Sequence, residues 1–520
     1  MSPRLLALAK GWSPRALDLL SLLPTIQLFR AFSAPMFAVP LGFDEQFFVW
    51  CGWSVLKGLV PYRDFVEFKP PMIPLVHALA LQLFGFEGCK FRIFFAAFSL
   101  CAILALQIAL LSRGVGRLLT AALCAGMVYL FVNFAFHDTS LSDTESIGFS
   151  FYFFGVAALI ARTKYEGVAN AIGGACLTCC VFSKEPFAAC VVPSWVACYF
   201  AIDRPLPFRV AARRYLQTSA LGIGVVVLGL CLYMIPSGAM KHYLAMLNWY
   251  RTLFNDPNDG YCVQLGIFRP TTLWHDLPRF AKIIGKRLLN PKWLGFLAPF
   301  LLISVVFVTQ RSRSLLLATL AAFAGGLYAT TIGLCFWDHY FVMAQSGMFF
   351  FCIVGLLAMT PSFRASRSWV RVSGSLAVAI IVALRVGPAY HAATPFVLDF
   401  GSAIVPETEP GTLAYIEAHS APTDKVFTTG PPGLYVATNR VHAVKLATGL
   451  KEYLAVLPGN TDAEKLRPLY EELVASRPKL VYLDPEHAER KRRHTKAVYL
   501  PFLRKFRYTQ VRPHLFMRPN

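Results

Sequence analysis

Runs of about 20 apolar residues recur along roughly the first 390 positions of the chain. An α-helix needs about 20 such residues to cross the hydrocarbon core of a bilayer. The pattern therefore predicts about eleven spanning helices, at residues 17–41, 92–112, 118–136, 146–161, 168–183, 186–202, 216–236, 293–309, 315–334, 340–360 and 372–390. The first run contains Pro24, Arg30 and Pro35, and a cleavable signal peptide is the alternative interpretation of that segment.

The loops between these runs alternate in charge. One alternate set is short and basic, and it holds Arg4, Lys10 and Arg15; Arg113 and Arg117; Arg162 and Lys164; Arg204, Arg209, Arg213 and Arg214; Arg311 and Arg313; and Arg364, Arg367 and Arg371. Since Lys and Arg gather in cytoplasmic loops, we expect this set and the N-terminus in the cytoplasm. The long loops 42–91 and 237–292 belong to the opposite set and are expected outside, as is the C-terminus if the number of spans is odd.

The pattern changes after residue 391. Residues 424–429 and 479–483 have the composition of buried strands, a Gly-Pro-Pro-Gly turn follows the first of them, and residues 412–419 and 463–476 have that of helices. Strands that alternate with helices favour a small α/β unit with parallel strands. The sequence therefore predicts an all-α polytopic membrane domain at residues 1–390 and a small extracytoplasmic α/β domain at residues 391–520.

Composition supports the membrane assignment. The chain is 56% hydrophobic and only 15% charged, whereas soluble domains carry about 25% charged residues. A net charge of +21 would suggest nucleic acid in a soluble protein, but here the positive residues fall in the predicted cytoplasmic loops. Membrane lipid, and no nucleic acid, is the expected partner. The 13 cysteines lie mostly in apolar runs and predict no disulfide framework, with one disulfide among Cys51, Cys89 and Cys262 left open.

Four groups of polar residues fall on the predicted outer face. Asp44 and Glu45 follow the first run and precede a predicted amphipathic interface helix at residues 47–57, after which prolines keep residues 59–71 from continuing a helix. The reactive side chains of the first group are those of Asp44, Glu45, Tyr62, Arg63, Glu67 and Lys69. Those of the other three groups are Asp143 and Glu145, then Lys184, then His339. Each group alone has a structural explanation, such as helix capping. Four groups on one face, beside a small domain, together predict a functional site.

A known family carries a similar pattern. The Asp44-Glu45 pair, the segment Pro61-Tyr62-Arg63-Asp64-Phe65 and the triplet Lys69-Pro70-Pro71 resemble the polyprenyl-phosphate-dependent glycosyltransferases of the C superfamily. The bacterial branch akin to protein O-mannosyltransferases and lipid A aminoarabinose transferases is the most similar. Asp143-Thr144-Glu145, Lys184 and His339-Tyr340 extend the resemblance. The chain departs from it at Phe68, where many relatives have His, and at Glu185, where an uncharged residue is usual.

The resemblance implies a function. A sugar would pass from a polyprenyl-phosphate carrier to a cell-envelope glycan, lipid or protein acceptor on the outer face of the bacterial inner membrane. Asp44 matches the catalytic base, with Glu45 beside it, and one base without a nucleophilic carboxylate implies inversion. The groups expected to hold the donor phosphate are Lys69, Lys184, Arg63 and His339.

The remaining residues have supporting roles in this interpretation. Asp143, Glu145, Glu67 and Tyr62 would support the acceptor or a metal, and a divalent cation is the one cofactor left open. A lipid-linked sugar transporter or flippase is the alternative function. Transporters bind their substrate near the bilayer midplane, whereas the acidic residues here crowd the outer ends of the spans, which disfavours transport.

Overall fold

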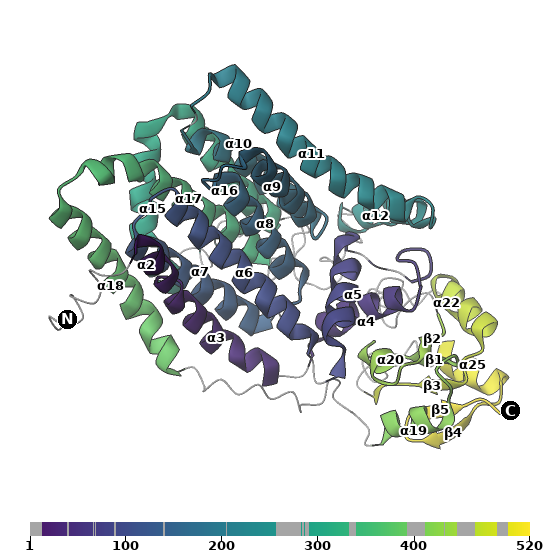
Figure 1. Ribbon diagram of the computed structural model, residues 1–520. Coiled ribbons are helices and arrows are strands. Elements are labelled where there is room, and N and C mark those ends of the chain that lie inside the picture. The colour runs from purple at the N-terminus through teal and green to yellow at the C-terminus, as the bar shows by residue number, and fades with distance from the viewer. Residues whose placement is uncertain are drawn as a thin grey trace.

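The structure is a computed structural model. It describes residues 13–38, 41–65, 67, 69–87, 90–138, 141–203, 205–255, 282, 285, 291–331, 340–392, 411–430, 432–444, 463–485 and 498–519. Long helices lie side by side in a bundle, and a small mixed sheet with its own helices lies against one end of that bundle (Figure 1).

The helices of the bundle follow one another with short connections. They are α2 (Pro14–Leu20), α3 (Leu23–Ala38), α4 (Phe43–Leu56), α5 (Met72–Phe84), α6 (Phe91–Ser112), α7 (Arg117–Asp138), α8 (Thr144–Ile160), α9 (Glu166–Val181), the 3-10 helix η2 (Glu185–Phe187), α10 (Ala188–Ala201), α11 (Phe208–Met234), α12 (Ala239–Asn255), α15 (Pro291–Arg311), α16 (Arg313–Thr331), α17 (Phe341–Ala365) and α18 (Ser368–Ala392).

Burial separates a central helix from peripheral ones. Every residue of α17 from 341 to 360 is buried, as expected for a helix that is apolar all round. By contrast, α11 and α18 expose large apolar side chains, including Leu221, Leu232 and Leu384 at 65%, 66% and 70%. Apolar side chains so exposed along two whole helices need a non-aqueous neighbour. The arrangement fits a bundle whose outer helices face lipid.

Each of the eleven predicted runs coincides with helix, so the helical character of the membrane part is confirmed. Among the described residues, five helices are long and apolar enough to cross a membrane, namely Phe91–Ser112, Phe208–Met234, Arg313–Thr330, Phe341–Ala365 and Ser368–Tyr390. Six further apolar helices are shorter, between 10 and 17 residues. The total of eleven spans and the orientation of the chain remain predictions.

The basic loops of the predicted cytoplasmic set meet at one end of the bundle. The guanidinium group of Arg113 donates hydrogen bonds to the carbonyl oxygens of Ile160 and Ala161, at 2.5 and 3.0 Å. That of Arg364 donates to the Arg113 carbonyl at 2.8 Å, and Arg311 pairs with Asp203 at 2.7 Å. Alternate loops therefore share one end, as the pattern of charges predicts.

The loop predicted at residues 42–91 contains more helix than expected. The predicted interface helix is α4, but it is not amphipathic, because Phe47, Phe48, Trp50 and Cys51 are all buried on different sides of it. Neighbours on two sides explain this: α5 packs against α4, and so does the short helix α20 (Gly433–Ala437) of the C-terminal part. Helix α5 was not predicted, since its 13 residues are too few to suggest a span.

The C-terminal part is a five-stranded sheet in the order β2-β1-β3-β5-β4. The strands are β1 (Lys425–Thr428), β2 (Val441–His442), β3 (Leu480–Tyr482), β4 (Thr509–Arg512) and β5 (Leu515–Met517), and the remaining helices are α19 (Thr412–His419), α22 (Ala463–Ser476) and α25 (Leu500–Lys505). β1 pairs in parallel with β3, as predicted, and also with the two-residue strand β2, which was not predicted. β5 and β4 add an antiparallel edge that was not predicted.

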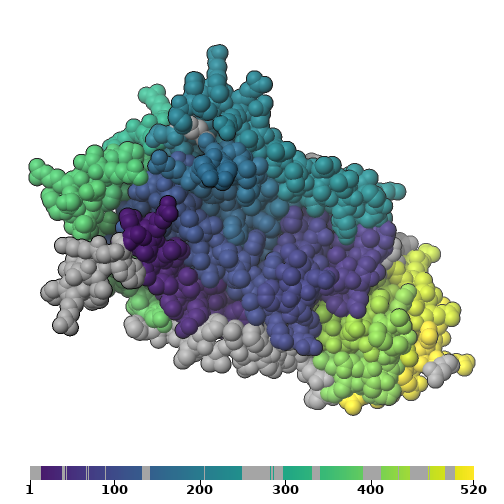
Figure 2. Space-filling model, in the orientation of Figure 1, coloured from purple at the N-terminus to yellow at the C-terminus, as the bar shows by residue number. Residues whose placement is uncertain are grey.

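Aromatic side chains join this sheet to the bundle. The buried ring of Trp50 on α4 lies 5.1 Å from the ring of His442 on β2 and 6.4 Å from that of Tyr435 on α20. On its other side Trp50 contacts Phe65, at 5.2 Å. The sheet therefore shares part of the core of the bundle, whereas a second cluster around Phe427 and Leu473 lies within the C-terminal part itself. Figures 1 and 2 show the resulting position, with the C-terminal part beside α4 and α5.

Candidate active site

Asp44 and Glu45 lie in the first turn of α4, where the positive end of a helix dipole favours negative side chains. Their environments differ sharply. Glu45 is 3% exposed and forms a bidentate ion pair with Arg92, whose Nε and Nη2 lie 2.8 and 2.5 Å from its two carboxylate oxygens. Asp44 is exposed. Of the two neighbouring carboxylates, Asp44 is the one that a substrate can reach.

Arg92 is a site residue that the sequence did not suggest. Besides Glu45, its guanidinium group bonds the Met36 carbonyl at the end of α3, at 2.5 Å. The Ser142 hydroxyl, just before α8, donates to Glu45 at 2.9 Å. The pair therefore fixes the start of α4 to α3, α6 and the residues before α8. Arg92 begins an apolar helix 47 residues from Glu45, so no local pattern pointed to the contact.

The segment at residues 59–71 holds the backbone of Lys69 from two sides. The buried Glu67 carboxylate accepts the Lys69 N–H at 2.7 Å. The Tyr62 hydroxyl donates to the Lys69 carbonyl at 2.6 Å. Tyr62 adopts φ 66°, in the left-handed region that non-glycine residues enter rarely. In this structure, Tyr62 and Glu67 position Lys69.

Arg63 lies in the same segment and has other partners. Its guanidinium group pairs with Asp64 at 2.7 Å and donates to the Ser237 carbonyl at 2.8 Å. Asp64 in turn accepts the Val60 N–H at 2.9 Å. These contacts attach the segment to the turn between α11 and α12.

A second cation, Lys184, comes from the turn between α9 and η2. The Met72 N–H, three residues after Lys69, donates to the Phe182 carbonyl at 3.1 Å, which brings this turn beside the Lys69 segment. The Lys184 ammonium group contacts the Glu145 carboxylate and lies 3.7 Å from the centre of the Tyr340 ring. Both partners of the ion pair are buried, at 7% and 4% side-chain exposure.

A close approach of two elements makes this ion pair possible. Gly148, one turn after Glu145 on α8, faces Phe187 so closely that a Cβ atom there would lie 2.6 Å from the Phe187 ring. Any larger residue would separate α8 from η2. The glycine therefore allows Glu145 to reach Lys184.

Charges of both signs surround Lys184. Burial lowers the pKa of its ammonium group well below the ordinary value, and Lys69 lowers it further. Glu185, Asp143 and Asp44 raise that pKa and oppose the shift. The carboxylate of Asp44 is therefore close enough to Lys184 to act on its charge. Asp44 at the start of α4, Asp143 before α8 and Lys184 after α9 thus lie near one another.

The structure therefore brings Asp44, Lys69, Asp143, Glu145 and Lys184 together at the end of the bundle that carries the sheet. His339, predicted to hold the donor phosphate, lies outside the described residues. Glu185, where the chain departs from the family pattern, accepts a hydrogen bond from Tyr243 on α12 at 3.5 Å. Within the described ranges, His, Cys, Asp and Glu side chains form no group of three or more that could hold a metal ion.

Comparisons with known proteins rest on the fold. The chain matches no protein-family profile and no curated protein. Among solved structures the chain is similar in fold to ArnT, in keeping with the lipid A aminoarabinose transferase-like fold that the sequence resemblance implied. The particular structure that carries this conclusion is ArnT from Cupriavidus metallidurans bound to undecaprenyl phosphate, with a TM-score of 0.54 and 12% identity over 92% of this chain and 95% of ArnT.

A second protein gives weaker matches. The oligosaccharyltransferase AglB from Archaeoglobus fulgidus, in complex with an inhibitory peptide and a dolichol-phosphate, has a TM-score of 0.49 and 13% identity over 98% of this chain and 75% of AglB. In the apo form its TM-score is 0.43, with 12% identity over 91% of this chain and 70% of AglB.

Proposed function

We propose that this chain is an integral membrane glycosyltransferase. It moves a sugar from a polyprenyl-phosphate carrier to a cell-envelope glycan, lipid or protein acceptor, on the outer face of the bacterial inner membrane. The observation that carries the proposal is the convergence of an exposed carboxylate, Asp44, with two lysines, Lys69 and Lys184, at one end of a bundle with the ArnT fold. ArnT itself was solved with undecaprenyl phosphate bound.

The chemistry needs one base and a phosphate site. The acceptor hydroxyl oxygen attacks the anomeric carbon, and its proton passes to Asp44. The bond between the anomeric carbon and the phosphate oxygen breaks, and its electron pair stays on the phosphate, which leaves as polyprenyl phosphate. A single displacement of this kind inverts the anomeric centre. No acid is required for the leaving group, because a phosphate is stable as an anion.

The two lysines would stabilise that leaving group. Charge-assisted hydrogen bonds to phosphate are stronger than neutral ones, and cations fixed before the reaction stabilise charge that develops in the transition state. Tyr62 and Glu67 hold the Lys69 backbone, while Glu145 and Tyr340 hold the Lys184 ammonium group. We therefore assign the donor phosphate to Lys69 and Lys184 and give Arg63 the role of fixing the segment.

Glu45 has a different role in this proposal from that of Asp44. Its carboxylate is buried against Arg92 and Ser142, so it orients the start of α4 and thereby the Asp44 side chain. Asp143 lies at the N-cap position of α8, beside Lys184, where it can orient an acceptor hydroxyl. The C-terminal sheet contacts α4 through Trp50, and we assign it the role of shaping the approach of the acceptor.

The test is transfer of a labelled sugar from a polyprenyl phosphate by the purified protein in nanodiscs. Loss of general-base help costs about 10²–10⁴ in rate, so Asp44→Asn should lose turnover by that factor. Glu87→Gln is the matched control, because this carboxylate follows α5 at the same end of the bundle and its side chain is 94% exposed. A folded Asp44→Asn variant with wild-type turnover would remove Asp44 from the mechanism.

The same protein in sealed liposomes separates transfer from transport, because the two leaflets then face separate compartments. A transferase releases free polyprenyl phosphate for each new glycosidic bond, whereas a flippase moves the intact lipid-linked sugar without breaking that bond. Movement of intact donor between leaflets, with no polyprenyl phosphate released in the presence of acceptor extract, would favour the transporter alternative.

A further inference from the structure

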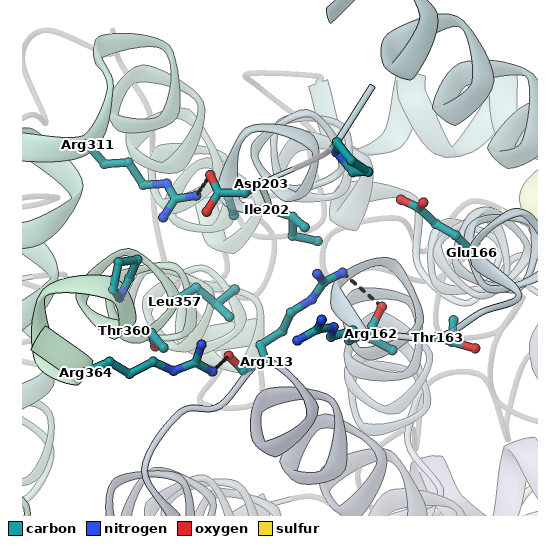
Figure 3. A pocket seen from close by; sticks show the side chains of 14 residues that line it. Arg113, Arg162, Thr163, Glu166, Ile202, Asp203, Arg311, Leu357, Thr360 and Arg364 are labelled. Atoms are coloured by element: carbon teal, nitrogen blue, oxygen red, sulfur yellow. Dashed lines mark hydrogen bonds and ion pairs between the residues drawn. The ribbon is translucent and has the colours of Figure 1, made fainter. Parts of the chain in front are cut away.

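A cavity of about 660 Å³ lies at the end of the bundle away from the sheet. Its walls come from the loops that follow α6, α8 and α10, and from the C-terminal ends of α15 and α17. Four arginines line it, namely Arg113, Arg162, Arg311 and Arg364. Figure 3 shows these four side chains among the residues that line it. Three loops and two helix ends that are far apart in the sequence thus form one basic cavity.

The charges lining the cavity do not balance. Against four arginines stand two carboxylates, Asp203 and Glu166. Asp203 pairs with Arg311 at 2.7 Å, with 88% and 17% of the two side chains exposed, and the two carboxylates together offset at most two of the four positive charges. An excess of positive charge therefore remains, in a cavity whose walls exclude part of the solvent.

Backbone contacts fix two of the guanidinium groups before any ligand arrives. Arg113 is held by the carbonyl oxygens of Ile160 and Ala161, and Arg364 by that of Arg113. Carbonyl groups orient a guanidinium without cancelling its charge. Arg162 has an exposed side chain beside them. Preorganised arginines with a fixed geometry are suited to bidentate binding of phosphate oxygens.

We propose that this cavity binds a phosphate group, and that its source is the headgroup of an anionic membrane lipid. The hydroxyl groups of Thr163 and Thr360 also line it, and Ile202, Leu357 and Pro205 supply an apolar wall that suits the glycerol and the first acyl carbons of a lipid. By the positive-inside rule this end faces the cytoplasm, where basic pockets between helices bind anionic headgroups. The site lies at the opposite end of the bundle from Asp44, and its occupancy does not depend on glycosyl transfer.

Arg162→Gln provides the test, because the Arg162 side chain is exposed and its replacement removes no buried contact. Detergent-purified wild type and variant are titrated with phosphatidylglycerol, with phosphatidylcholine and with inorganic phosphate, and binding is followed by thermal shift and by native mass spectrometry. Loss of one charge-assisted hydrogen bond corresponds to a fall in affinity of about tenfold or more. We expect Arg162→Gln to weaken phosphatidylglycerol binding about tenfold or more, and Arg162→Gln/Arg311→Gln to weaken it further.

Lys164→Gln is the control. It removes the same charge from the same loop, but Lys164 does not line the cavity and its ammonium group lies 4.8 Å from the Tyr165 ring. Weakening by Lys164→Gln equal to that by Arg162→Gln would overturn the proposal, since general surface charge would then explain binding. So would equal affinity for phosphatidylcholine. Binding of inorganic phosphate that depends on Arg162, without binding of phosphatidylglycerol, would overturn the lipid source and assign the site to a soluble phosphate compound.

Discussion

Replacing Glu45 with Gln should destabilise the end of the bundle that carries the sheet. Gln keeps the shape of the side chain but removes its charge, so Arg92 is left with no carboxylate where the bidentate pair now stands. Both side chains are buried, at 8% and 3% exposure. Removing one partner of a buried ion pair costs about 3–5 kcal/mol, because it leaves an uncompensated buried charge. The remaining bond from Arg92 to the Met36 carbonyl, at 2.5 Å, offsets only part of this.

The assay is equilibrium unfolding in mixed detergent–SDS micelles, followed by tryptophan fluorescence. We expect Glu45→Gln to lower the free energy of unfolding by about 3–5 kcal/mol. The exposed pair of Glu87 with Lys90, at 3.9 Å, is the matched control, and Glu87→Gln should cost about 0–1 kcal/mol. The double variant Glu45→Gln/Arg92→Gln should cost less than the two single changes added together, because the second change removes the stranded charge.

Two results would refute this reasoning. One is a Glu45→Gln protein as stable as the wild type to within about 0.5 kcal/mol, the usual size of a surface substitution. The other is strict additivity in the double variant, which would mean that Glu45 and Arg92 do not act on each other. If Glu45→Gln were stable and yet lost turnover as completely as Asp44→Asn, the carboxylate would have a direct role in catalysis.

The remaining predictions concern Tyr62, Lys184 and His442. Tyr62→Phe removes one neutral hydrogen bond to the Lys69 carbonyl, worth about 0.5–1.5 kcal/mol, so KM for the donor should rise severalfold while kcat changes less, and an unchanged KM would contradict the positioning role. Burial lowers the pKa of Lys184, so the lysine loses its charge, and donor binding should weaken, at a pH below the ordinary lysine range. Lys184→Arg keeps its charge and should shift this loss of donor binding to higher pH. A pH profile of KM for the donor, measured on both proteins, checks this. Burial also lowers the pKa of His442 to about 4, from 6.5. As pH falls, the unfolded state therefore binds the proton before the folded state does, and the free energy of unfolding should fall by about 3 kcal/mol between roughly pH 6.5 and 4. Thermal unfolding of His442→Asn over that range should show a smaller fall; an equal fall would mean that His442 is not its cause.

Local sequence patterns predicted elements whose cause is local. The bounds expected for α19 and α22, residues 412–419 and 463–476, agree with the structure, because helical periodicity and the turns beside it lie within a few residues of each other. The hairpin of β4 and β5 was missed, since its strands are only four and three residues long, β4 ends on Arg512, and β5 depends on pairing with the distant β3. The strand propensity of single residues predicts little where pairing with a distant strand determines whether a strand forms.

The residues of the candidate site also fall into those that the local sequence suggested and those that it did not. Asp44, Lys69 and Lys184 stood out because each belongs to a short polar segment beside an apolar run. The contacts that position them could not be predicted from the local sequence. Arg92 reaches Glu45 across 47 residues, and the bond from the Tyr62 hydroxyl to the Lys69 carbonyl is separate from the acceptor or metal support that the sequence suggested for Tyr62. Residues that position others are recognised from contacts, whereas residues that carry charge at a helix end are recognised from the sequence.

The contacts of Trp50 limit how the C-terminal part of such a protein can change during evolution. Its ring lies between the sheet, through His442 and Tyr435, and the segment that carries Lys69, through Phe65. A C-terminal unit from another protein would have to reproduce those aromatic surfaces before it could be grafted here. New acceptors would therefore arise by substitution in place, in the loops around Asp44, and not by exchange of the C-terminal unit as a ready-made module.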